Sequence, residues 1–183
     1  PANVQVISTA RGLGKLPLVS KSVVYDKGYY WFRNRHTLGT KKLEEDVVAM
    51  KKIGINTIER TMPGFYDGKL SDILIKNKIN LIPRFWMLAT PEVITSERQM
   101  QQQKDKILAT VKANLSKKNI IAWSLGKDVL FSLSNQSYKP AYFYYQQKYV
   151  LWLADVTRQI RKLDTLRPIV MDLQWDDKGI TRF

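Results

Sequence analysis

Short apolar runs alternate with longer segments of helical periodicity along most of this chain, and this rhythm strongly constrains its fold. The strand-like runs are INTIER (55–60), INLIPRFW (79–86), NIIAWSL (119–125) and RPIVMDL (167–173). Segments with apolar residues at helical spacing precede each of them, at 41–54, 70–78, 96–117 and 140–163. Strands that are apolar on both faces and alternate with helices predict a parallel sheet with helices outside it.

Residues that start and stop helices stand at the expected boundaries. Gly54 follows the first helical segment and is expected to end it. Ser96 is placed to cap the long helix that follows it, because its hydroxyl can accept a hydrogen bond from the first turn. Pro140 suits the first turn of the last helix, where its missing N–H costs nothing.

The N-terminal part has a different character. Residues 1–21 contain glycines and a proline and are expected to be a linker or an approach strand. SVVYDKGYYWF (22–32) alternates around Asp26-Lys27-Gly28, a pattern typical of a β-hairpin whose glycine supplies the positive φ of the turn. The rest, residues 22–183, is treated as one repeating domain.

Four to five βα units can be counted from residue 32 onwards. A doubly wound sheet could hold this number, and so could part of an eight-unit barrel. The stretch RGLGK (11–15) stands ahead of the repeat and does not follow a strand, so we expect no phosphate-binding loop there. In both architectures the chemistry lies at the carboxyl ends of the strands.

Net charge is the unusual part of the composition, at +14 over 183 residues. This balance favours acidic partners, such as an anionic polysaccharide, a membrane surface or nucleic acid. The lysines are scattered in pairs and no aromatic-basic RNA motif is present, which argues against dedicated nucleic-acid binding. No apolar run approaches the roughly 20 residues of a transmembrane helix.

Metal and redox chemistry have little support in the sequence. There is no cysteine, which excludes disulfides and a thiolate zinc site. His36 is the single histidine and has no carboxylate partners at ligand spacing. We therefore expect no metal and no cofactor. The chain begins at Pro1 rather than Met, so we expect a processed product or a piece of a longer protein.

Charged and aromatic residues gather where the predicted strands end. They are Asn34, Arg35, His36, Glu59, Arg60, Arg84, Trp86, Lys127, Asp128, Asp172 and Trp175. Sugar-binding clefts are commonly built from these residue types, because rings stack on apolar sugar faces and charged groups bind hydroxyls. A phosphate site would need glycines or a metal cluster beside the arginines.

Four stretches resemble the catalytic barrel of glycoside hydrolase family 2, the group of β-galactosidases, β-glucuronidases and β-mannosidases. They are FRNRHTLG (32–39), EDVVAMKKIGINTIERTMP (45–63), NIIAWSLGKD (119–128) and DTLRPIV (164–170). The Asn-Arg-His and Trp-Ser-Leu-Gly pieces are the specific ones, and the likeness covers about residues 22–173. It implies a (β/α)8 TIM barrel whose first four to five units are present here. Residues 22–32 would then be a hairpin that leads into the first strand.

The resemblance also implies a function and a site. The family hydrolyses β-linked sugars with two carboxylates, so the expected partner is an oligo- or polysaccharide. Asp128 stands at the position of the general acid/base. The substrate-binding positions would be Asn34, Arg35, His36, Glu59, Arg60, Trp86, Lys127, Asp172 and Trp175. The resemblance and the absence of cysteine together favour an exported bacterial protein, periplasmic or extracellular.

Departures from the family pattern bear on catalysis. Asp128 replaces a glutamate, and the lost methylene withdraws the carboxyl by on the order of 1 Å, enough to cost about a hundredfold in rate. Lys127 replaces an asparagine and would favour the ionised carboxylate, whereas a general acid must hold its proton. The family's nucleophile is a glutamate on the seventh strand, and the sequence ends just past the fifth. A retaining hydrolase needs both carboxyl groups, about 5 Å apart.

Two main function classes therefore stay open from the sequence, beside a third, electrostatic association with nucleic acid or a membrane. One is a glycosidase, completed by the remainder of a larger polypeptide or by a second half-barrel chain. The other is a non-catalytic carbohydrate-binding or scaffold module, a degenerate glycosidase that could favour acidic glycans. Individual residues also have structural alternatives. Asp128 could cap a helix or pair with Lys127, His36 could be structural, and the tyrosines of 138–153 could simply pack.

Overall fold

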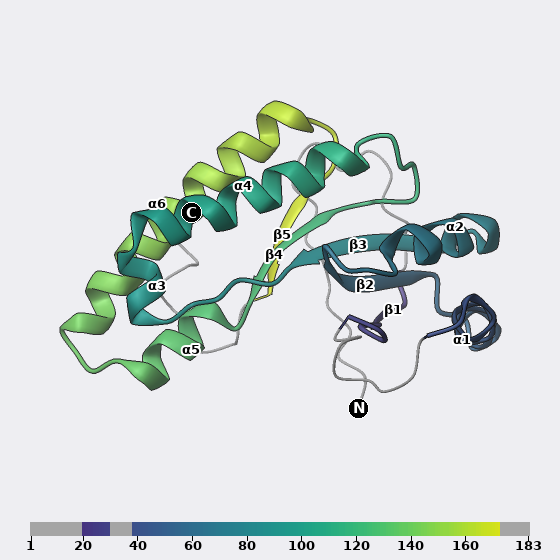
Figure 1. Cartoon of the computed structure of the whole chain (residues 1–183), viewed down its shortest axis with the longest axis horizontal. Helices are drawn as coiled ribbons and strands as arrows, with labels where there is room; N and C mark the ends of the chain where they lie inside the picture. The colour runs from purple at the N-terminus through teal and green to yellow at the C-terminus, as the bar shows by residue number, and fades with distance from the viewer. Residues whose placement is uncertain (1–19, 30–37, 173–183) are drawn as a thin grey trace. The chain divides into compact units, whose positions relative to one another are not determined.

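The computed structural model describes residues 20–29 and 38–172 (Figure 1). The chain divides into two compact units. The first runs to Arg84 and includes the segments 117–123 and 166–168. The second contains residues 85–116, 124–165 and the chain from Ile169 onwards.

Five strands form one parallel sheet in chain order, which confirms the predicted α/β class. They are β1 (Ser22–Val24), β2 (Thr57–Met62), β3 (Asn80–Phe85), β4 (Trp123–Lys127) and β5 (Ile169–Asp172). Val24 pairs with Glu59 across β1 and β2, and the N–H of Asn80 donates to the carbonyl of Asn56 at 2.9 Å. This register decides which side chains meet where the strands end.

Each unit has its own helices. In the first, α1 (Thr40–Lys52) packs against α2 (Asp67–Asn77). The helices of the second are α3 (Pro91–Thr95), α4 (Glu97–Asn114), α5 (Val129–Gln136) and α6 (Ala141–Leu163). Helices α4 and α6 lie side by side, and α3 and α5 both contact α6 (Figure 1). Among the described residues, no helix is long and apolar enough to cross a membrane.

The predicted helix boundaries agree with the structure to within a few residues. Gly54 follows α1 with φ +84°, and its N–H donates to the carbonyl of Lys51 at 3.0 Å. The Ser96 hydroxyl accepts from the N–H of Gln99 at the start of α4, and Pro140 directly precedes α6. Ile53 continues the apolar series of α1 in sequence but is 76% exposed, because the helix ends at Lys52.

The strand predictions need correction. Strand β2 begins two residues later than expected, and β4 is Trp123–Lys127, although Ile120 still forms a bridge with Leu81. Residues 22–24 belong to the sheet, where β1 pairs in parallel with β2, and the hairpin with residues up to 32 stays a prediction. The Tyr29 N–H donates to the Asp26 carbonyl, so the predicted turn exists, while residues 30–32 lie outside the described part. Alternation identifies a strand but not its partner.

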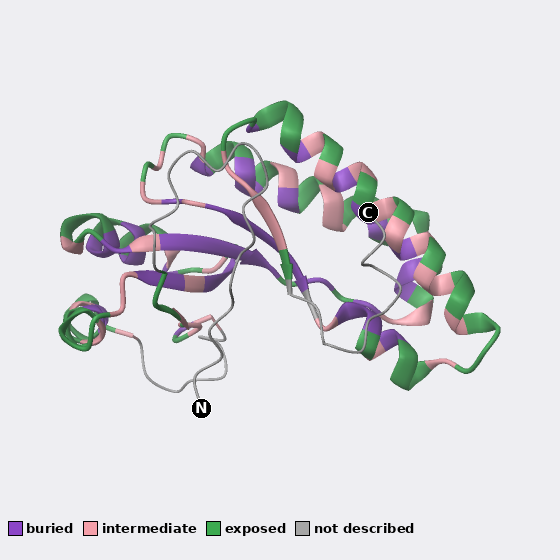
Figure 2. Cartoon of the chain, turned by 180° about the vertical axis from the view of Figure 1, so that it is seen from behind, coloured by how far each residue is buried: buried purple, intermediate pink, exposed green. Residues whose placement is uncertain are grey.

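Strands β2 and β3 are buried along most of their length, as their colour in Figure 2 shows. In the first unit the side chains of Leu43, Ile58 and Leu74 are fully buried, each with 0% exposure. Trp123 is also 0% exposed, as expected of a core residue, and the Arg167 guanidinium lies 5.6 Å from its ring centroid. Burial rather than helix propensity holds these short elements together.

Replacing Leu74 by alanine should lower the free energy of unfolding by about 2–5 kcal/mol, because it leaves a cavity in a fully buried place. The neighbouring Ile75 is 49% exposed on the same helix, so Ile75→Ala should cost less than about 1 kcal/mol. Urea denaturation of both variants measures the difference. Equal losses would mean that α2 does not pack as described.

Candidate functional site

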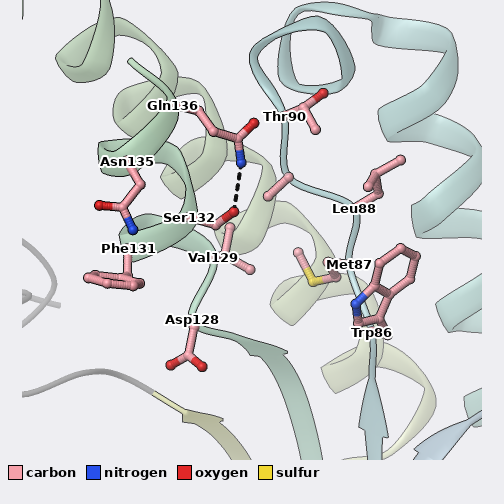
Figure 3. A pocket seen from close by; sticks show the side chains of 11 residues that line it. Trp86, Met87, Leu88, Thr90, Asp128, Val129, Phe131, Ser132, Asn135 and Gln136 are labelled. Atoms are coloured by element: carbon pink, nitrogen blue, oxygen red, sulfur yellow. Dashed lines mark hydrogen bonds between the residues drawn. The ribbon is translucent and has the colours of Figure 1, made fainter. Parts of the chain in front are cut away.

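A pocket of about 400 Å³ lies within the second unit, beyond the carboxyl ends of β3 and β4 (Figure 3). One wall is the segment 86–90, which follows β3, and the other is Asp128 with helix α5. This is the place where parallel α/β folds carry their ligands. Trp86 and Asp128, both predicted as site residues, line the same pocket.

The segment 86–90 is fixed from behind by α4. The Gln103 side chain accepts from the Leu88 N–H at 2.9 Å and donates to the Leu88 carbonyl at 3.3 Å. Such a two-way amide clamp replaces the strand partners that the chain loses after β3. Thr90 then starts α3, because its hydroxyl accepts from the Val93 N–H. Trp86 is left 56% exposed on this fixed wall.

Asp128 stands at a sharp bend between β4 and α5. Its backbone is left-handed, with φ 51° and ψ 28°, and its carbonyl accepts from the Ser132 N–H at 2.9 Å. Asp tolerates this conformation better than most side chains because it is short and polar. The carboxylate makes no capping hydrogen bond to α5, so the helix-capping role considered from the sequence is not the one adopted.

Gly126 makes the bend possible two residues earlier. Its φ is +73°, which favours glycine. A Cβ at Gly126 would meet the Tyr149 hydroxyl and the Val129 side chain, each at 3.2 Å. Tyr149 is 3% exposed, and its burial raises the pKa of its hydroxyl. The neutral phenol therefore stays protonated behind the end of β4.

Helix α5 contributes a ring and two amides to the pocket. Phe131 is 44% exposed, and the Gln136 amide donates to the Ser132 hydroxyl at 2.9 Å (Figure 3). Asn135 lines the same wall. Among the described residues that line the pocket, Asp128 is the single carboxylate. The arrangement suits a polar ligand with apolar faces, and it supplies one proton-transfer group.

A second polar cluster lies in the first unit, where β1, β2 and β3 end. Two residues beyond the Val24–Glu59 pair, the Asp26 carboxylate accepts from the Thr61 N–H at 2.7 Å. The same carboxylate accepts from the Arg84 guanidinium at 2.5 Å, and Arg84 also donates to the Thr61 hydroxyl at 2.8 Å. Arg84 is 6% exposed. These three side chains tie the turn after β1 to the next two strands.

Arg60 supports the same turn from the other face of β2. Its Nε donates to Asp67 at 2.7 Å, and its Nη1 donates to the carbonyls of Tyr25 and Lys27 at 3.0 and 3.1 Å. With 1% exposure, Arg60 is a buried structural group in this arrangement. Glu59 is half-buried, and the alternation along β2 points it away from Arg60, as expected.

The structure describes only some of the predicted site residues. Trp86 and Asp128 share the pocket, while Glu59 and Arg60 belong to the first unit. Lys127 and Asp172 end β4 and β5, and their side chains are not described. Asn34, Arg35, His36 and Trp175 lie outside the described residues. Their roles stay predictions.

Sequence reasoning missed residues of the α5 wall of the pocket and one residue of the polar cluster in the first unit. Phe131, Asn135 and Gln136 were not expected because helix α5 was not predicted. Asp26 was interpreted as a hairpin turn residue, although its position just after an apolar strand was a usable signal. In the described part of the chain, no group of three His, Cys, Asp or Glu residues could hold a metal ion.

Electrostatics around the turn after β1 centre on Asp46 of α1. Burial alone would raise its pKa, but hydrogen bonds from Lys27 at 2.6 Å and from the Tyr25 hydroxyl at 2.9 Å outweigh that effect. The pKa of Asp46 therefore lies below its ordinary value of 3.8. Burial, together with the hydrogen bond to Asp46, raises the pKa of Tyr25.

No protein-family model matches the sequence, and no curated protein matches it. Solved structures do match by fold. A β-glucuronidase from Bacteroides uniformis superposes with a TM-score of 0.62 at 13% identity, over 73% of this chain and 16% of its own. A GH2 β-galacturonidase from Eisenbergiella tayi, bound to galacturonate, gives 0.63 at 17% identity, over 83% of this chain and 24% of its own.

A β-D-mannosidase from Dictyoglomus thermophilum gives a TM-score of 0.63 at 14% identity, over 85% of this chain and 18% of its own. These neighbours are glycoside hydrolases, and the resemblance to family 2 is confirmed at the level of the fold. The chain spans less than a quarter of the length of each of these three enzymes.

Replacing Arg84 by methionine should lower the free energy of unfolding by about 2–3 kcal/mol. The change removes the ionic partner of Asp26, and breaking a buried pair is costly, with some relief because Asp26 is 30% exposed. Lys76→Ala breaks the exposed pair with Glu44 and should cost at most about 0.5 kcal/mol. Urea denaturation compares the two variants. If Arg84→Met costs no more than Lys76→Ala, the ion pair between Arg84 and Asp26 does not stabilise the fold as described.

Replacing Asp46 by asparagine should cost about 1–2 kcal/mol at pH 7, because charge-assisted hydrogen bonds from Lys27 and Tyr25 are lost. The folded pKa is lowered, so this stability exists above the unfolded value and disappears as the pH falls through the folded value, below 3.8. Urea midpoints from pH 2 to pH 7 should converge for wild type and Asp46→Asn in acid. Exposed Asp72→Asn serves as the control, and a gap that persists at pH 2 would refute the assignment.

Proposed function

We propose that this chain forms part of a glycoside-hydrolase-like barrel and that the pocket beside Asp128 binds a carbohydrate. The observation that carries the proposal is the pocket itself, which brings Trp86 and Asp128 together beyond the ends of neighbouring strands. An exposed indole can stack on the apolar face of a sugar ring, and a carboxylate can accept from its hydroxyls. The fold of the glycoside hydrolases described above supports the same class of ligand.

The barrel is the architecture that these observations favour over a doubly wound sheet. Chain-order pairing of parallel strands is what an eight-unit barrel requires, because each strand neighbours the next one in sequence. The Rossmann type of doubly wound sheet instead reverses its strand order at a switch point. We infer that the strands described here are consecutive units of such a barrel. The remaining units would come from a larger polypeptide or from a second chain.

Hydrolysis of β-linked sugars is the activity that Asp128 could serve, as the acid/base of a pair of carboxylates. The second carboxylate would have to come from outside the described lining, where Asp128 is the single one. Binding without hydrolysis is the second candidate, and this count of carboxylates favours it. The two candidates share the ligand class and differ only in the fate of the glycosidic bond.

Replacing Trp86 by alanine should weaken binding of a simple β-glycoside about tenfold, because one stacking surface is lost. The probes are the p-nitrophenyl β-glycosides of glucuronic acid, galacturonic acid and mannose, measured by calorimetric titration. Phe65→Ala removes a ring that is 71% exposed in the first unit and should leave binding unchanged. Failure of all three probes to bind, or equal weakening by Phe65→Ala, would contradict the proposal.

In the complete assembly, with the remaining barrel units present, the Asp128→Asn variant separates the two candidates. If the protein is a hydrolase, release of p-nitrophenol should fall by about 10²–10⁴-fold in this variant, because the proton-transfer group is gone. If it is a binding module, the wild type releases no p-nitrophenol and Asp128→Asn still binds the glycoside. Full hydrolytic activity in Asp128→Asn would exclude the acid/base assignment.

A further inference from the structure

We infer that the start of helix α6 carries a second carbohydrate-binding surface, which takes a carboxylate-bearing polysaccharide. This surface consists of Tyr138, Lys139, Phe143, Tyr144 and Lys148, and we call it the α6 aromatic patch. None of these residues lines the pocket beside Asp128. Binding at the patch therefore does not depend on the function proposed for that pocket.

The rings of the patch lie open to solvent, although helical tyrosines usually pack. Tyr138 is 93% exposed, Phe143 51% and Tyr144 49%. Tyr149 of the same helix is 3% exposed and does pack, as expected. The outer face of a surface helix is normally polar, so several open rings at one end of α6 indicate a contact surface.

Two lysines are held over these rings. The Lys139 ammonium lies 5.2 Å from the centroid of Phe143, and the Lys148 ammonium lies 5.2 Å from the centroid of Tyr144. Tyr144 and Lys148 are four residues apart within α6, the spacing at which side chains meet on a helix, whereas Lys139 precedes the helix. A lysine held by a ring loses less freedom when an anion binds it. The patch therefore presents two positioned cations beside apolar surface.

Charge around the patch selects an acidic partner. From residue 129 to residue 154 the sequence contains no Asp or Glu, so no carboxylate of this segment neutralises the two lysines. The whole chain carries a net charge of +14, which attracts polyanions at a distance. A neutral partner would gain nothing from either feature.

Ring faces and hydroxyls narrow the acidic partner to a polysaccharide. The C–H bonds on one side of a pyranose are slightly positive and pack on the negative face of an aromatic ring. Tyr138, at 93% exposure, leaves its ring free for such a contact, and the tyrosine hydroxyls can bind sugar hydroxyls. The carboxylates of a uronate polymer would meet Lys139 and Lys148. A membrane surface would use the cations but does not need this combination.

A polymer also fits the position of the patch along the chain. Helix α5, whose Gln136 lines the pocket, ends just before Tyr138, and α5 and α6 contact each other. A polysaccharide long enough to follow α5 could hold to the patch with one part and leave another part at the pocket. The patch would then raise the local concentration of substrate or ligand.

The experiment measures binding of polygalacturonate to the 183-residue chain by calorimetric titration at moderate salt. Phe143→Ala combined with Tyr144→Ala should weaken binding about tenfold, and Lys139→Gln combined with Lys148→Gln should do the same. Lys51→Gln combined with Lys52→Gln removes the same charge from the end of α1 and should have a much smaller effect.

Two further probes distinguish the polysaccharide from other polyanions. Poly-glutamate of matched charge and vesicles of phosphatidylglycerol should both bind more weakly than polygalacturonate. Equal binding of poly-glutamate, equal loss in the Lys51/Lys52 variant, or a preference for the vesicles would overturn the inference. If the Phe143/Tyr144 variant fails to fold by circular dichroism, Tyr138→Ala replaces it, because that side chain makes little contact with the core.

Discussion

The register of the parallel strands is the constraint on which the first unit depends. Pairing of Val24 with Glu59 brings Asp26 beside Thr61, and Arg84 reaches both from the next strand. A shift of one residue would turn these side chains to the opposite face and leave a guanidinium buried without its carboxylate. The contacts among Asp26, Thr61 and Arg84 therefore specify how these three strands pair.

In the second unit, specific contacts hold the segments that form the pocket walls after β3 and β4. The chain after β3 has no strand partner, and the amide of Gln103 replaces that partner at Leu88. The chain at the end of β4 passes through two left-handed residues, Gly126 and Asp128, before α5 begins. One wall is therefore fixed by the Gln103 side chain and the other by the path of the backbone. The side chains of Trp86 and Asp128 line the pocket between them.

Helices were predictable here because their ends carry chemical signals. Gly54 and Ser96 stand where the structure uses them, and long amphipathic segments leave little choice of periodicity. Strand limits were less certain, since an apolar run continues into the loop that feeds it, as before β4. Helix α5 was missed because VLFSLSNQ is short, although Asp128, an ordinary cap residue, stands directly before it. Exposure of the α6 rings could not be predicted, because tertiary packing decides which face of a helix is covered.

The left-handed backbone of Asp128 limits which residues this position accepts. Aspartate and asparagine tolerate such a conformation, while longer side chains are disfavoured by up to about 1–2 kcal/mol. Placing a longer acid such as glutamate at position 128 would therefore require the β4–α5 junction to change its path as well as its side chain. At this end of the sheet, the path of the backbone and the length of the acid have to be designed together.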